Sequence, residues 1–156
     1  MRARLLLPAL VALLALLSAS CAAPRSRAYA TRADAEAAGE TGSGALPAWV
    51  PASATALRLA GSADGERWLR FDLPPGDAAA LKARLLRVPD AQVATLDLFA
   101  PRGADWWFAA LAAARPDEPG AVVAEVYSGS GAEVSTRTWL AFDTRSDSVW
   151  VWSRGR

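Results

Sequence analysis

The feature that most constrains the fold of this chain is a two-residue alternation of apolar and polar side chains between turn-forming clusters. Residues 67–73 read RWLRFDL, in which every second side chain from the leucine onward is large and apolar. This period indicates a half-buried β-strand, because successive side chains of a strand point to opposite faces of a sheet. Residues 55–60 alternate in the same way across a turn cluster at 61–65, which predicts a first hairpin.

The next part of the chain predicts the main helix. Residues 78–87 (AAALKARLLR) are strong helix formers, Asp77 is placed to cap their amino end, and Pro89 ends the run. Leu81 and Leu85 are four residues apart, so both are expected to pack against the sheet. Further strands are expected at 93–100, 121–128, 135–143 and 148–153.

These elements predict an α+β domain, since hairpins rather than βαβ units link the strands. We expect a single curved antiparallel sheet of five or six strands with one main helix packed on one face. Residues 104–114 (ADWWFAALAAA) stay ambiguous, because their composition favours a helix while their aromatic start also suits a strand or an ordered loop.

Composition excludes several classes of protein. The chain has 156 residues, 53% of them hydrophobic, with one Cys and no His. It can bury a core, but it lacks the residues for a disulfide scaffold, a His/Cys metal site or a Ser-His-Asp triad. The 17 basic and 16 acidic residues give no electrostatic case for nucleic acid. We expect no metal, no cofactor, no nucleic-acid partner and no enzymatic activity.

The amino terminus is typical of a secretory signal. Arg2 and Arg4 precede an apolar run at 5–17, small residues occupy 18–20, and Cys21 follows at once. The 13 apolar residues are too few to cross a bilayer, which takes about 20.

The stretch LSASC ending at Cys21 resembles the lipobox of bacterial lipoproteins, although Ser18 stands where the usual lipobox has Leu. The resemblance implies diacylation of the Cys21 thiol, cleavage before it, acylation of the new amine with chains such as palmitate, and membrane attachment through this lipid. The alternative is an ordinary cleaved signal with a chance Cys. Ala22 is not the Asp that signals inner-membrane retention in enteric bacteria. In a Gram-negative host the inner leaflet of the outer membrane is therefore favoured.

Three segments follow from this division. Residues 1–20 form the signal peptide, 21–48 the acylated Cys with a flexible tether, and 49–156 the folded envelope domain. The tether has few large apolar residues and a Gly-Ser-Gly near its end, and about 25 such residues span about 25–30 Å.

The order of short motifs over residues 46–153 resembles a group of small bacterial lipoproteins of unknown function. The motifs are Leu46-Pro47 with Ser53-Ala54-Thr55, the strand Trp68–Phe71 running into Pro74, Trp106-Trp107, Phe142-Asp143, and the aromatic last strand at Val149–Trp152. The resemblance implies a shape and a compartment, and no activity.

Two sets of residues are candidate binding sites. An aromatic patch for a glycan, peptide or protein would comprise Trp106, Trp107, Trp139, Trp150 and Trp152; the alternative is that these rings fill the core. A cationic stripe for a phosphate or carboxylate would comprise Arg58, Arg70 and Arg137; the alternative is a solvated face paired with acids.

We therefore expect a lipid-anchored, non-catalytic protein of the bacterial envelope, facing the periplasm, that binds a partner protein or cell-wall glycan through an aromatic-rich surface. One alternative is an inhibitor or immunity-type protein that blocks an envelope enzyme. Another is a small wall hydrolase, for which Asp72, Asp97 and Asp143 are the available carboxylates, in a spacing that fits no known motif.

Overall fold

The computed structural model describes residues 26–93, 95–96, 101, 104, 106–107 and 124–155. The expected signal peptide and Cys21 lie outside these residues. So do most of the strand expected at 93–100 and most of the ambiguous segment at 104–114.

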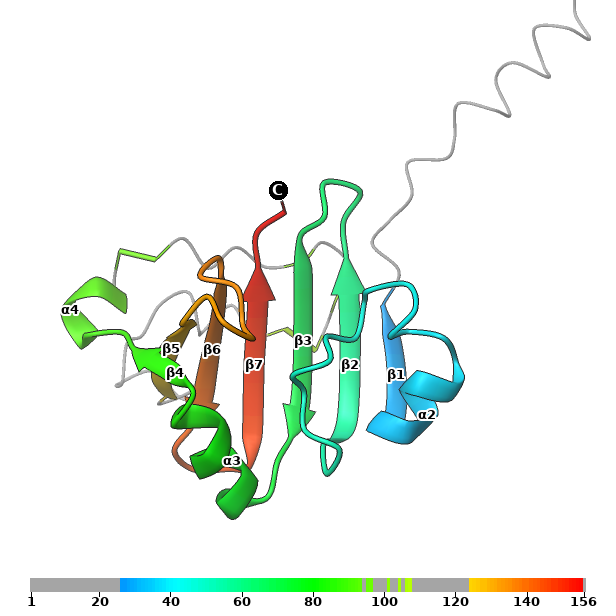
Figure 1. Cartoon of the computed structure of the whole chain (residues 1–156), viewed down its shortest axis with the longest axis horizontal. Coiled ribbons are helices and arrows are strands. Elements are labelled where there is room, and N and C mark those ends of the chain that lie inside the picture. The colour runs from blue at the N-terminus through cyan, green and yellow to red at the C-terminus, as the bar shows by residue number, and fades with distance from the viewer. Residues whose placement is uncertain are drawn as a thin grey trace, which may run out of the picture.

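The described residues form one antiparallel sheet of seven strands in the order β1-β2-β3-β7-β6-β5-β4 (Figure 1). Every neighbouring pair is antiparallel. The strands are β1 Arg27–Thr31, β2 Thr55–Gly61, β3 Arg67–Asp72, β4 Leu85–Arg87, β5 Ala124–Gly129, β6 Thr138–Asp143 and β7 Ser148–Ser153.

The expectation of five or six strands with one main helix is wrong. The fold is dominated by the seven-stranded sheet, and the described residues add three short helices, α2 Arg32–Ala37, α3 Pro75–Lys82 and α4 Asp90–Val93. Two strands escaped prediction, β1 and β4, and they are the two edges of the sheet. Both carry weak sequence patterns, RAYAT and LLR, so pairing with their neighbours decides their conformation.

The expected helix at 78–87 starts earlier and ends sooner, because its second half pairs with the sheet. α3 stops at Lys82, a turn follows, and Leu85–Arg87 then pairs with Tyr127–Gly129 of β5. Asp77 does not cap the helix; Pro74 occupies the cap position, and the Asp77 carboxylate accepts a hydrogen bond from Ser53 Oγ at 2.5 Å.

Residues 26–48, expected to form most of the tether, lie within the folded body. β1 pairs with β2, and Thr31 and Asp34 form a capping box that starts α2. The Glu40 carboxylate is buried, where it accepts hydrogen bonds from the Tyr29 hydroxyl and pairs with Arg27 at 2.7 Å. A charge buried in this way needs such partners, so this segment is fixed to the sheet.

Both faces of the sheet are buried, and their chemistry differs. The helix face packs leucine, valine and phenylalanine side chains of the strands against Leu81 of α3, Ala35 of α2 and the loop that carries Leu46 and Val50. The opposite face, here called the tryptophan face, carries Trp68, Trp150 and Trp152. Val88 and Trp107 pack on the tryptophan face. No helix in the described part of the chain is both long and apolar enough to cross a membrane.

Candidate functional site

Three of the five tryptophans proposed as a binding patch are buried. Trp107, Trp150 and Trp152 are 6%, 2% and 1% exposed. The Trp107 ring meets Trp150 and Trp152 edge-on, with ring centroids 5.7 and 6.4 Å apart. Aromatic rings prefer this geometry in packed interiors, so these three side chains form the core of the tryptophan face.

The other two tryptophans are half-buried at the margin of that core. Trp139 stacks on Trp152 at 6.1 Å, with the Arg154 guanidinium 5.9 Å from its ring. Trp106 meets Trp107 edge-on and donates a hydrogen bond from Nε1 to Ser26 Oγ at 2.7 Å. Of the predicted aromatic patch, these two rings retain accessible surface.

The three arginines do not form one stripe. Arg58 and Arg70 are direct neighbours across β2 and β3, but Arg70 is turned into the structure. Its guanidinium lies 5.2 Å from the Trp150 ring and donates to Ser148 Oγ at 2.9 Å. Arg137 is exposed in the turn before β6, three strands from β2 in the sheet. Arg70 is thus a packing residue, while Arg58 and Arg137 are separate surface cations.

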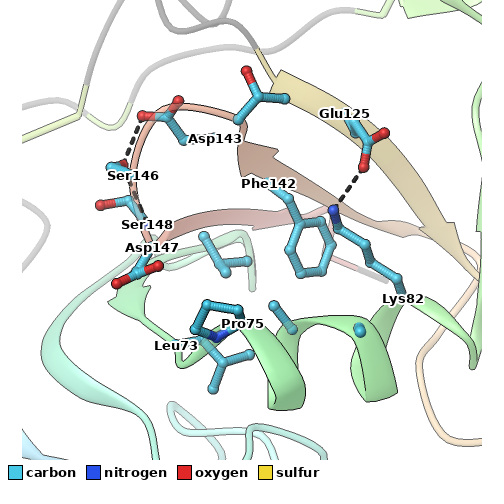
Figure 2. A pocket seen from close by; sticks show the side chains of 13 residues that line it. Leu73, Pro75, Lys82, Glu125, Phe142, Asp143, Ser146, Asp147 and Ser148 are labelled. Carbon is cyan, nitrogen blue, oxygen red and sulfur yellow. Dashed lines mark hydrogen bonds and ion pairs between the residues drawn. The ribbon is translucent and has the colours of Figure 1, made fainter.

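A cavity of about 380 Å³ lies on the helix face, between α3 and the turn that joins β6 to β7 (Figure 2). We call it the Lys82 pocket. Its apolar wall is formed by Leu73, Pro75, Ala78, Ala79, Phe142 and Val149, and its polar wall by Lys82, Glu125, Asp143, Thr144, Ser146, Asp147 and Ser148.

The polar wall is centred on an ion pair over an aromatic ring. Lys82 Nζ donates to Glu125 Oε2 at 2.6 Å and lies 4.9 Å from the centroid of the Phe142 ring. Arg87 donates to the other oxygen of Glu125 at 2.9 Å. The hydrogen bond from Lys82 holds the pKa of Glu125 below its usual value, with smaller contributions from the nearby charges. Glu125 therefore stays ionised at neutral pH, and the ammonium keeps a fixed position.

The rim of the pocket carries two further carboxylates. Asp143 accepts hydrogen bonds from Ser146 Oγ at 2.7 Å and from the Arg145 backbone N–H at 2.9 Å, which shapes the turn (Figure 2). Asp147 is exposed at the same rim. Lys82 and Arg87 both pair with Glu125, so the negative charge of the pocket comes from Asp143 and Asp147 at the rim, and these carboxylates favour a cationic guest.

Sequence analysis missed this pocket, although one signal was present. Lys82 is the sole lysine of the chain. In the sequence it is one residue of the run of helix formers at 78–87, with nothing local that indicates a pocket. The pocket draws Lys82 from α3, Glu125 from β5 and Asp147 from the turn after β6, and only the sheet order brings them together.

Within the described ranges, no three acidic side chains are grouped so as to hold a metal ion. No family model, curated protein or solved structure matches the chain. The resemblance to small bacterial lipoproteins therefore stays a prediction from sequence.

Proposed function

We propose that this chain is a lipid-anchored, non-catalytic protein of the bacterial envelope, which binds a partner protein through the Lys82 pocket. The observation that carries the binding half is the pocket itself, an apolar cavity of about 380 Å³ with a carboxylate rim. The anchoring half rests on Cys21, placed directly after a signal-like apolar run.

The shape and charge of the pocket favour a basic side chain as its guest. The hydrocarbon stem of an arginine or lysine would lie against Pro75 and Phe142, and its charged head would reach Asp147 at the rim. Long basic side chains bury apolar stems in this way while their heads stay polar. The rim carboxylates pair with a cationic head, which neutral sugar rings lack, and this supports a protein partner over a wall glycan.

The ionisation of Glu125 supports a binding role for this residue rather than acid–base chemistry. A general acid works best when its pKa is raised toward the working pH. The pKa of Glu125 is lowered instead, because Lys82 donates to it. The ion pair thus serves to hold the wall of the pocket in one geometry.

Photo-crosslinking in intact cells tests this function. Thr144→benzoylphenylalanine places a reactive group at the rim, and we expect one adduct of defined polypeptide mass. Ala79→Trp fills the pocket and should abolish that adduct. Ala80→Trp is the matched control, because Ala80 is exposed on the same helix and does not line the cavity.

Three results would contradict this function in different ways. An adduct that survives Ala79→Trp would exclude the pocket as the binding site. An adduct with the mass of a sugar fragment would replace the protein partner by a glycan. Release of soluble sugars from purified cell wall would establish the hydrolase alternative. A crosslinked enzyme that loses activity on binding would sharpen the proposal to an inhibitor or immunity-type protein.

A further inference from the structure

The strand register identifies the end of the sheet at which the chain enters the fold. β1 begins at Arg27, opposite Leu59, and β2 ends two residues later at Gly61. Gly61 pairs with Arg67, and Arg67 pairs with Ser153, which pairs with Thr138. These residues lie at one end of the strands, which we call the entry end. It is at the top of the sheet in Figure 1, where the carboxyl end of the chain also lies.

The chain leaves little distance between this end and the proposed anchor. Ser26 is only five positions after Cys21. A fully extended chain spans about 3.3–3.6 Å per residue, so Cys21 lies within about 18 Å of Ser26. The entry end is therefore held at the surface of any membrane to which Cys21 is attached.

A second cavity, of about 650 Å³, opens at the entry end. Arg67 and Arg154 line it, together with Ser135, Ser153 and Thr138, whose hydroxyl lies 2.9 Å from that of Ser153. Arg67 beside these hydroxyls suits a phosphate diester, which arginine recognises through paired hydrogen bonds, and the Arg154 guanidinium lies 5.9 Å from the Trp139 ring at the same end.

Two acidic residues also line this cavity, and one of them is paired with an arginine outside it. Glu133 is held by Arg84 at 2.5 Å, and Asp64 lies in the turn between β2 and β3. Exposed Arg137 adds positive charge at the same end. The opposite end carries the exposed carboxylates Asp77 and Asp147 together with Arg145.

Aromatic side chains complete the entry end. Trp106 bonds to Ser26, where the chain enters, and Trp139 follows Thr138 in β6. Both rings are half-buried. Indole rings favour the boundary between lipid headgroups and hydrocarbon, because one edge is apolar and the other donates a hydrogen bond.

We propose that the entry end rests on anionic phospholipid headgroups and that the cavity lined by Arg67 and Arg154 takes a headgroup phosphate. The body is then held in one orientation, with α3 and the Lys82 pocket directed away from the bilayer. This inference rests on the anchoring proposed above, and the charge complementarity at the entry end is independent of it.

The test uses the acylated protein in vesicles of phosphatidylethanolamine and phosphatidylglycerol. Benzoylphenylalanine replaces Ala63 at the entry end or, as the matched control, Ala80 on α3; both alanines are exposed. After illumination, intact mass spectrometry counts phospholipid adducts. We expect at least about tenfold more adduct from position 63 than from position 80, since each basic side chain near an anionic surface raises its affinity about fivefold.

Two further arms test the role of charge. Vesicles of phosphatidylcholine alone, with no change to the protein, should lower the yield at position 63 toward that at position 80. The pair Arg67→Glu and Arg154→Glu should do the same in anionic vesicles, whereas Arg145→Glu at the opposite end should leave the yield unchanged.

Equal adduct yields from positions 63 and 80 in anionic vesicles, with the acyl mass present on Cys21, would overturn the orientation and leave the anchor in place. Headgroup recognition would be overturned if the adduct yield at position 63 stayed the same in phosphatidylcholine vesicles and in the variant with Arg67→Glu and Arg154→Glu. A bare Cys21 in the same spectrum would remove the anchor, and this inference with it.

Discussion

The two faces of the sheet are buried by different means. On the helix face, aliphatic side chains of the strands meet Leu81 of α3 and the loop around Val50. On the tryptophan face, indole rings from β3, β6 and β7 belong to one cluster with Trp107, which meets the two rings of β7 edge-on. Aliphatic packing depends on volume, whereas ring packing also fixes angles. A strand that is apolar on both sides, such as β7, is therefore a core strand and gives no evidence of a binding surface.

The largest expected effect is the loss of the ring at the centre of the tryptophan face. Trp152→Ala should lower the free energy of unfolding by about 3–5 kcal/mol, because Trp152 is buried between Trp107 and Trp139. Urea unfolding followed by far-UV circular dichroism measures this change. The half-buried Trp139→Ala is the control and should cost less. Equal costs would show that the tryptophan face is not packed around Trp152.

A somewhat smaller effect is expected where the helix meets its face. Leu81→Ala should lower the free energy of unfolding by about 2–5 kcal/mol, because Leu81 is the fully buried side chain of α3. Leu86→Ala is the matched control, since Leu86 is 57% exposed on the neighbouring strand and should change stability by less than about 0.5 kcal/mol. The same denaturation experiment compares them, and a cost at Leu86 as large as at Leu81 would contradict the assignment of β4 as an edge strand.

Arg70 provides a third test, since it joins a charge to the tryptophan face. Arg70→Met should lower the free energy of unfolding by about 1–2 kcal/mol, because the guanidinium loses its contact with the Trp150 ring and its hydrogen bond to Ser148. Arg58→Met, on the adjacent strand and exposed, should leave the midpoint of thermal unfolding nearly unchanged. If Arg58→Met destabilised as much as Arg70→Met, the two arginines would act as one stripe after all.

The smallest expected effect depends on pH. The pKa of Glu125 is lower in the folded chain than in the unfolded one, so protonation favours unfolding. The stability from this pair is present above the unfolded pKa, about 4.3, and is lost as the pH falls through the folded pKa. Glu125→Gln should therefore unfold at a lower temperature than the wild type at pH 7. At pH 2–3 the two unfolding temperatures should become equal. If the difference in unfolding temperature between the two proteins did not change with pH, the ionisation of Glu125 would be excluded as its cause.

Sequence patterns predicted the strands whose alternation is strong. β3 lies where expected because large apolar side chains recur at every second position, and β7 because its continuous run of valine and tryptophan suits a strand. β4 was missed, because Leu85 and Leu86 continue a run of helix formers. Their strand conformation comes from pairing with β5, about 40 residues later. β1 was missed because its alanines resemble a tether; Tyr29 and the buried Glu40 fix it to the sheet.

The candidate site was less predictable than the fold. The pattern of β7, apolar on both sides, left open whether its second face meets another segment of the chain or a partner, and Trp107 covers that face. The Lys82 pocket has no local signature, since its residues come from α3, β5, β6, β7 and the turn between the last two, which the sheet order brings together. The period of apolar residues predicts each strand separately. A pocket depends on which strands become neighbours in the sheet, and the period does not predict that order.

The intact mass of the native protein, purified from membranes, tests the lipid anchor most directly. The anchored form predicts a polypeptide of residues 21–156 carrying the mass of two or three fatty acyl chains on Cys21. An uncleaved leader, or a free thiol at Cys21, would contradict it.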